Sequence, residues 1–234
     1  MLVGRWVSLR PVMPEDLGFL YKLLLEPSVG TRYRFYGATP SFEEFAHRAW
    51  DSVVGQWLVV SRASRRPVGF TVISSADHRS GTAHFSVVGT PDTWRGAVMM
   101  DAMGVFFRYV FWAFPFRRLF AETAEDNLSQ FASGQGRFFE LEGCRREAIW
   151  LRGRYQDLHF LTVSRERWRD VGEPFHRRLM AGAGNGDDDR AGRTAGGAAT
   201  EPDDRPDRSD PADRPDQSDL DERVIVDGRG RRTT

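Results

Sequence analysis

The stretch that decides the fold is residues 82–124, TAHFSVVGTPDTWRGAVMMDAMGVFFRYVFWAFPFRRLFAETA. The segments Thr82–Val88 and Arg117–Ala124 each have the pattern of a buried strand. Between them lie the loop Gly89–Gly96 and an apolar segment with helical periodicity that continues to about Phe114. A strand, a helix and a second strand in this order predict a right-handed crossover whose two strands run parallel in one sheet.

The flanking segments extend this unit on both sides. Two helices open with recognisable start signals: Pro14 with Glu15 and Asp16 begins one through about Leu25, and Ser41 with Glu44 begins another from Phe42 to about Val53. The other elements that we expect are strands at Trp6–Pro11, Trp57–Ser61, Val68–Ser74, Arg145–Leu151 and Asp157–Ser164, and helices at Asn127–Glu140 and Arg165–Leu179. The order β-α-α-β-β-β-α-β-α-β-β predicts an α/β fold with a mixed sheet.

The chain divides near residue 180. Residues 1–180 carry the periodic segments, whereas 181–234 are mostly Gly, Ala, Asp, Arg and Pro. Such a composition buries too little apolar surface to offset chain entropy, so we expect a globular domain over 1–180 and a disordered low-complexity tail over 181–234. The tail is either a solvated extension or a carrier of a partner-binding motif, for which Val224–Val226 is the apolar candidate.

Charge and composition exclude several classes of function. The net charge is zero, and residues 1–180 hold 24 basic and 19 acidic side chains with no basic run, which suits a small anionic ligand and argues against nucleic acid. The longest apolar run, Val105–Phe116, is too short to cross a membrane, and the N-terminus lacks a signal peptide pattern. The one cysteine, Cys144, and the scattered histidines predict neither a disulfide nor a metal site. We expect a cytoplasmic protein.

The start of the central helix is a candidate anion site. Free backbone N–H groups at Gly96–Met99 would point out of the helix, and the helix dipole would add to their attraction for a pyrophosphate. The alternative is an ordinary loop-to-helix turn, because a single Arg95-Gly96 pair is a weak signal.

The ordered series of motifs resembles the GNAT (GCN5-related N-acetyltransferase) superfamily over about Trp6–Trp168, and within it the RimJ/RimL-like branch. The motifs that carry the resemblance are Val7-Ser8-Leu9-Arg10-Pro11, Val88-x-x-Pro91-x-x-Trp94-Arg95-Gly96, Arg117-Arg118-Leu119-Phe120-Ala121-Glu122, Asn127, Leu141-Glu142-Gly143-Cys144-Arg145, Gly153-x-Tyr155-x-Asp157 and Arg165-Glu166-Arg167-Trp168.

The resemblance implies acetyl transfer from acetyl-CoA to a primary amine by direct attack, with no acyl-enzyme. It assigns the pyrophosphate to Arg95, Gly96, Ala97, Val98 and Met99, and a contact with the cofactor or the splayed strand to Asn127. In such enzymes two parallel strands splay apart, the pantetheine arm fills the gap, and a backbone N–H near Val87 or Val88 polarises the thioester carbonyl. The acceptor is a protein N-terminus or a small-molecule amine, and many relatives are homodimers.

The candidates for proton transfer are Glu122, Glu147 and Ser133. Glu122 is either the base that deprotonates the amine or a strand residue paired with Arg117 or Arg118. Glu147 is either a substitute for a carboxylate that relatives carry two residues further along the same strand face or an ordinary surface residue. Ser133 is either the hydroxyl that protonates the CoA thiolate or a small packing residue.

Three departures from the family pattern leave a second hypothesis open. The loop Arg95–Ala102 lacks the second glycine, Gly134 stands where some relatives carry a tyrosine acid, and Phe138-Phe139 replaces the usual Gly-Phe. The chain is therefore either a functioning transferase or a degenerate module that binds acyl-CoA or a protein partner without catalysis. An open gap between the two parallel strands favours the enzyme, and a gap filled by Trp94, Met99 or Phe131 favours the module.

Overall fold

The computed structural model describes residues 2–31, 33–93, 96–132 and 134–182. Four sequence expectations therefore lie outside the described residues: the roles of Arg95 and Ser133, the filling of the gap by Trp94, and the tail from residue 183 onward. Ala181 and Gly182, which we assigned to the tail, still belong to the last helix.

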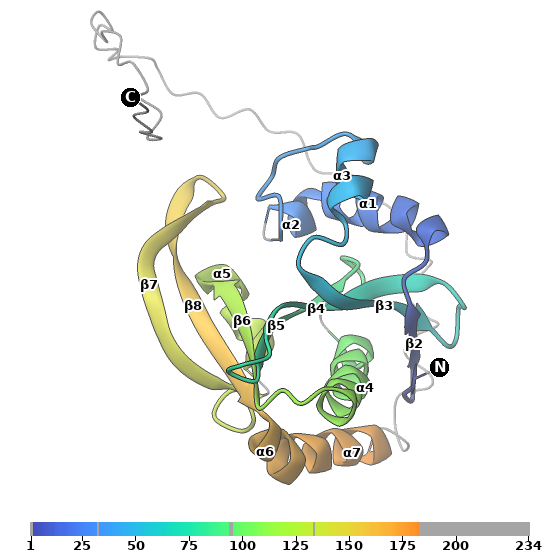
Figure 1. Ribbon diagram of the computed structural model, residues 1–234, viewed down its shortest axis with the longest axis vertical. Helices are drawn as coiled ribbons and strands as arrows, with labels where there is room; N and C mark the ends of the chain where they lie inside the picture. Colours follow the sequence, from blue (N-terminus) through green and yellow to red (C-terminus); the bar gives the residue numbers. More distant parts are fainter. Residues whose placement is uncertain (1, 32, 94–95, 133, 183–234) are drawn as a thin grey trace, which may run out of the picture. The chain divides into compact units, whose positions relative to one another are not determined.

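Eight strands form one sheet in the order β1-β2-β3-β4-β5-β6-β8-β7 (Figure 1). The pair β5–β6 is parallel, and all other neighbours are antiparallel. This confirms the predicted mixed α/β fold. The strands are β1 (Leu2–Val3), β2 (Val7–Pro11), β3 (Val53–Ser61), β4 (Pro67–Asp77), β5 (Thr82–Gly89), β6 (Arg118–Ala124), β7 (Glu140–Leu151) and β8 (Arg154–Ser164).

The helices cover the two faces of this sheet unequally. On one side lie η1 (Pro14–Asp16), α1 (Leu17–Leu25), α2 (Pro27–Gly30) and α3 (Phe42–Arg48), and on the other α4 (Ala97–Ala113), α6 (Arg165–Arg167), η3 (Trp168–Gly172) and α7 (Glu173–Gly182) (Figure 1). The short turns α5 (Glu125–Leu128) and η2 (Ser129–Phe131) follow β6. The hairpin β7–β8 extends beyond these helices, and most of β7 is exposed.

Each face has its own apolar core. Phe106, Phe107 and Val110 of α4 are fully buried against one face of the sheet. Leu20 of α1 and Phe45 of α3 are buried against the opposite face, over β3 and β4. Packing on both faces holds β3, β4 and β5 in place. β6 pairs only with the first half of β5, and a gap opens beside the second half.

Two helices are shorter than the sequence pattern predicts. The helix predicted to reach Val53 ends at Arg48, although Ser41 does cap it by accepting a hydrogen bond from Glu44 N at 3.2 Å. The predicted helix Asn127–Glu140 is only α5 and η2, because Gly136 adopts a positive φ of 71° and Gly134 lies against the rings of Phe138 and Phe139.

Asp101 is a charged residue in the middle of the core. Its side chain is fully buried in α4. Its Oδ2 accepts hydrogen bonds from the backbone N–H groups of Trp6 and Val7, at 2.7 and 3.2 Å, and Oδ1 lies 3.2 Å from Nε2 of His176 on α7. One carboxylate thus joins the first strands, the central helix and the last helix.

Candidate functional site

The two parallel strands separate after three residue pairs. β5 and β6 pair only at Thr82–Arg118, Ala83–Leu119 and His84–Phe120. Beyond that point β5 remains paired with β4 up to Gly89, and β6 remains paired with β8 up to Ala124. Residues 85–89 and 121–124 therefore do not pair with each other, and the two strands splay apart as the sequence resemblance implies.

A cavity of about 580 Å³ fills this gap, and we call it the splay cavity. It has the size and the mainly apolar lining of a small-molecule site. Met99 and Phe131 form part of its wall without filling it. The described residues that line it come from six segments: Ser28, Val29, Tyr33, Phe85, Ser86, Val87, Val88, Gly96, Met99, Met100, Met103, Ala121, Glu122, Thr123, Asn127, Ser129, Gln130 and Phe131.

The hydrogen-bond register decides which backbone N–H group of β5 faces the gap. Thr90 N donates to Val68 O at 2.9 Å, one step beyond the Gly69–Gly89 pair. Because antiparallel pairs alternate between bonded and non-bonded, Val88 exchanges hydrogen bonds with β4 and Val87 directs its N–H into the splay. Of the two candidates that the sequence left open, Val87 therefore has the available donor.

The first turn of α4 borders the same cavity. Gly96 is the N-cap in an extended conformation, and the first helical bond runs from Met100 N to Gly96 O at 3.3 Å. The N–H groups of Ala97, Val98 and Met99 precede this bond and have no acceptor within the helix. Gly96 and Met99 line the cavity, whereas Ala97 and Val98 are not among its lining residues.

Glu122 is the one charged side chain among the described residues of the splay cavity. The sequence left open an ion pair with Arg117 or Arg118. Arg118 instead pairs with Glu142 at 3.0 Å, and Arg117 Nε donates to Ser80 O at 2.7 Å. Glu122 forms no ion pair with any residue that the structure describes, and its exposed carboxylate can accept a proton from a bound molecule.

Asn127 lies on α5 at the edge of the cavity. Its Nδ2 donates to Thr123 Oγ1 at 3.1 Å, and its Oδ1 accepts a hydrogen bond from Gln130. The asparagine thus ties the end of β6 to the turn that follows. A contact with the splayed strand is one of the two roles that the resemblance implies for Asn127, and the contact with the cofactor stays a prediction.

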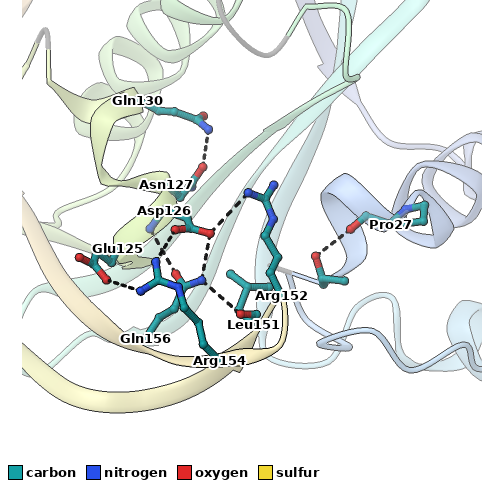
Figure 2. A network of polar contacts seen from close by, with 10 residues as sticks. Pro27, Glu125, Asp126, Asn127, Gln130, Leu151, Arg152, Arg154 and Gln156 are labelled. Carbon is teal, nitrogen blue, oxygen red and sulfur yellow. Dashed lines mark hydrogen bonds and ion pairs between the residues drawn. The ribbon is translucent and has the colours of Figure 1, made fainter. Parts of the chain in front are cut away.

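An ionic network fixes α5 to the tip of the β7–β8 hairpin (Figure 2). Asp126 lies 3.0 Å from Arg154 and 3.4 Å from Arg152, and Gln156 Nε2 donates to its Oδ2 at 2.9 Å. The hydrogen bond from Gln156, followed by the effects of Arg154 and Arg152, lowers the pKa of Asp126 below its ordinary value. The carboxylate next to Asn127 therefore stays ionised in mild acid.

This pKa shift predicts an acid-sensitive contribution to stability. A depressed folded-state pKa stabilises the fold above the unfolded value of 3.8, and the contribution is lost as the pH falls through the lower folded value. We therefore expect Asp126→Asn to lower the melting temperature at pH 6, and the difference from wild type to vanish in strong acid. Thermal melts between those limits would measure it, with Glu43→Gln on α3 as control. A difference that is independent of pH would contradict the assignment.

Glu147 lies away from the cavity. Arg145 and Ile149 pair with Leu158 and Gln156, so three residues of β7 stand opposite the single residue Asp157. Glu147 sits in this bulge with a positive φ of 48°, and its N–H donates to Asp157 Oδ1 at 2.9 Å. The bulge breaks the alternation on which the same-face argument depended, and Glu147 lines neither the splay cavity nor its neighbour.

The sequence reasoning missed Tyr33 and Ser86. The composition of the segment 31–37, rich in aromatic and arginine residues, is typical either of an acceptor-binding loop or of a loop that packs aromatic rings into the core; in the structure Arg34 donates to the carbonyls of Arg48 and Ala49 at the end of α3. Tyr33 lines the splay cavity and forms a hydrogen bond with Ser86, and desolvation raises the pKa of its phenol. No local motif indicates this pair, because only the fold brings residue 33 beside β5.

Packing accounts for one departure from the family pattern. Phe138 and Phe139 are both buried, and Phe139 contacts Phe131 at 5.3 Å between ring centroids. A Cβ at Gly134 would lie 2.6 Å from Phe139 and 2.7 Å from Phe138. The paired rings thus require glycine at the position where some relatives carry a tyrosine. Cys144, on the neighbouring strand β7, is exposed.

The family model described as acetyltransferase (GNAT) domain matches residues 7–132, which is more than half of the chain. The chain belongs to the GNAT acetyltransferase family. The match contains β5, α4, β6 and Asn127, and hence both edges of the splay. No curated protein sequence matches the chain.

Solved structures share this GNAT fold at low sequence identity. A chimera of the spermidine N-acetyltransferase SpeG from Vibrio cholerae and hSSAT is 18% identical, with a TM-score of 0.61, over 70% of this chain and 99% of that one. The Vibrio cholerae spermidine N-acetyltransferase in complex with CoA and spermine is 17% identical, with the same TM-score and coverage. A third structure of that enzyme, with manganese ions, gives 18% and 0.59 over 70% and 96%.

Two other classes of feature are absent from the described residues. No helix there is long and apolar enough to cross a membrane. No group of three or more His, Cys, Asp or Glu side chains there could hold a metal ion.

Proposed function

We propose that this protein is an N-acetyltransferase that uses acetyl-CoA and transfers the acetyl group to a primary amine by direct attack. The observation that carries the proposal is the open splay between β5 and β6, which brings an edge N–H of Val87, the start of α4 and the Glu122 carboxylate to one cavity. The family match supports acetyl transfer, and a structural neighbour in complex with CoA and spermine supports the pairing of CoA with an amine.

The cofactor would occupy the gap along its length. Its pyrophosphate would accept hydrogen bonds from the first N–H groups of α4, at Gly96–Met99, where the helix dipole also favours negative charge. Its pantetheine arm would lie against Met99, Met100 and Met103, whose flexible thioethers adapt to an irregular apolar chain. The open edge of β5 would pair with its amides as a strand would.

The reaction requires three proton movements. Primary amines are protonated near neutral pH, so Glu122 would take a proton from the ammonium directly or through one water. The free amine attacks the thioester carbon, and the carbonyl oxygen accepts a hydrogen bond from Val87 N–H. The attacking nitrogen then releases its second proton to solvent, and the carbon–sulfur bond breaks. The neutral phenol of Tyr33 gives the thiolate its proton and recovers one from solvent.

The role of Tyr33 has its own test. Tyr33→Phe keeps the ring against Phe70, at 5.6 Å between centroids, and removes the hydroxyl. We expect kcat to fall about 100-fold or more, since one positioned proton donor contributes on this scale. The affinity for acetyl-CoA, measured by calorimetry, should stay unchanged. An unaltered kcat would contradict the role.

Cofactor binding is the first experiment on the proposal. A Cβ at Gly96 would meet only Thr93 O, at 3.9 Å, and the extended backbone there accepts any residue. Gly96→Trp should therefore fold and yet block the cavity. We expect wild type to bind acetyl-CoA with micromolar Kd, about −8 kcal/mol, and the variant to lose at least about 100-fold.

Gly18→Trp provides the matched control, because a side chain at Gly18 on α1 also meets open space and is not part of the cavity. Wild type that does not bind acetyl-CoA would overturn the proposal. In that case the second hypothesis would hold, namely that the chain is a degenerate module whose altered loop Arg95–Ala102 does not support catalysis.

The acceptor is proposed at the level of a primary amine. The resemblance to the RimJ/RimL-like branch supports protein N-termini and small amines, and the neighbours named above act on spermidine. A homodimer and a cytoplasmic setting remain predictions from the sequence.

A further inference from the structure

A second cavity adjoins the splay cavity on the face of the sheet that α4 does not cover. Its volume is about 360 Å³, and its lining is His84, Phe120, Ala121, Glu122, Glu142, Gly143 and Phe160. Along β6, Leu119 and Ala121 are buried in the core with α4, whereas Phe120 and Glu122 point to the opposite face. Ala121 and Glu122 line both cavities, so a group bound in the second one meets the proposed base.

The charged side chains around this second cavity leave one carboxylate, that of Glu122, to pair with a positively charged ligand. Glu142 is already paired with Arg118 at 3.0 Å, while Glu122 has no ion pair among the described residues. Arg145 places its guanidinium 5.6 Å from the centroid of the Phe160 ring. A ligand with one ammonium would pair with Glu122, whereas a second ammonium would meet Arg118 and Arg145.

The remaining walls are aromatic. Phe120 stands beside His84, with 6.0 Å between ring centroids, and Phe160 is the cross-strand partner of Glu122. Aromatic walls that flank one carboxylate match a flat apolar body that carries a cationic group. The volume lies at the small end of the range for ligand sites, which suits a single-ring molecule and not a long chain.

We propose that the second cavity is the acceptor site and that the acceptor is an arylalkylamine with a single positive charge. The proposal rests on the acetyltransfer function proposed above and adds the substrate class. The ring of the acceptor lies between Phe120 and Phe160, and its ammonium lies at Glu122. The amine nitrogen then faces the thioester from the side opposite to α4.

Gly143 offers a direct way to close this site. It is the cross-strand partner of Phe160, and a Cβ added there meets nothing within 4 Å. Gly143→Leu therefore places an isobutyl group in the cavity without a backbone clash. Gly18→Leu on α1 is the matched control, because a Cβ at that glycine also meets open space.

The experiment uses the full chain, acetyl-CoA and three acceptors: 2-phenylethylamine, spermidine and a short peptide with a free N-terminus. Thiol release gives kcat and KM, and calorimetry gives 2-phenylethylamine binding to the protein saturated with CoA. We expect the highest kcat/KM for 2-phenylethylamine. Gly143→Leu should raise its KM and its Kd by at least about tenfold, with the Kd of acetyl-CoA unchanged.

Three results would overturn the inference while the acetyltransfer function stands: a preference for spermidine, a preference for the peptide, or 2-phenylethylamine binding that Gly143→Leu leaves intact. Loss of the function itself has another signature, namely no binding of acetyl-CoA to wild type and no thiol release with any amine. That result would overturn both proposals together.

Discussion

Glu122→Gln is expected to lower kcat about 100- to 1,000-fold, which is the usual contribution of a positioned general base. The carboxylate borders both cavities and is not held by Arg117 or Arg118, so it can receive the proton that the ammonium must lose. Glutamine has the same shape and cannot take a proton. The Kd of acetyl-CoA should change less than about twofold, because the cofactor contacts come from the backbone of β5 and the start of α4.

The pH dependence separates a base from a binding residue. If Glu122 removes the proton, the defect of Glu122→Gln should shrink as the pH approaches the pKa of the free amine, because the substrate then arrives deprotonated. If Glu122 only bound the ammonium, Glu122→Gln would raise KM and leave kcat unchanged. Pre-steady-state thiol release over a pH series would distinguish these cases.

Glu147→Gln is the matched control for this measurement. Sequence reasoning offered the two glutamates as alternative bases, but the bulge at Arg146–Ala148 takes Glu147 away from both cavities. We expect its kcat to equal that of wild type. A large loss in Glu147→Gln together with an active Glu122→Gln would reverse the assignment of the base.

The sequence predicts the central unit well because its signals are local. The strand Thr82–Val88, the helix from Gly96 and the strand that ends at Ala124 each carry a periodicity that their own burial dictates, and the structure places all three within a residue or two. The parallel pairing follows from the length of the connection. The candidates Val87 and Gly96 lie on these elements and Asn127 follows directly on α5, and the fold brings all three to one cavity with Glu122.

The parts that the sequence did not predict depend on contacts between distant segments. The phenol of Tyr33 reaches β5 only because α1 and α2 pack on the sheet, and no spacing in the chain records this. The bulge that moves Glu147 has no glycine or proline to mark it. The segment after Asn127 has a helix-like composition, yet the buried rings of Phe138 and Phe139 determine its path.

The burial of Asp101 also depends on contacts between distant segments, and we expect this residue to contribute strongly to stability. Asp101→Ala is expected to lower the free energy of unfolding by about 3 kcal/mol, because two backbone N–H groups and the imidazole of His176 lose a buried charged acceptor. For a domain of this size the loss corresponds to a fall of about 10 °C in Tm. Urea unfolding and thermal melts would measure both quantities.

Asp92→Ala, which removes an exposed carboxylate, should change stability by less than about 0.5 kcal/mol. A double-mutant cycle with His176→Ala isolates the contact to α7. If the carboxylate joins three elements, the two losses will not add, because Asp101→Ala already releases the imidazole and most of its own cost lies at Trp6 and Val7. Additive losses would show that the contact between Asp101 and His176 contributes nothing to stability. A cost for Asp101→Ala no larger than for Asp92→Ala would show that the first strands hold to the sheet without this carboxylate.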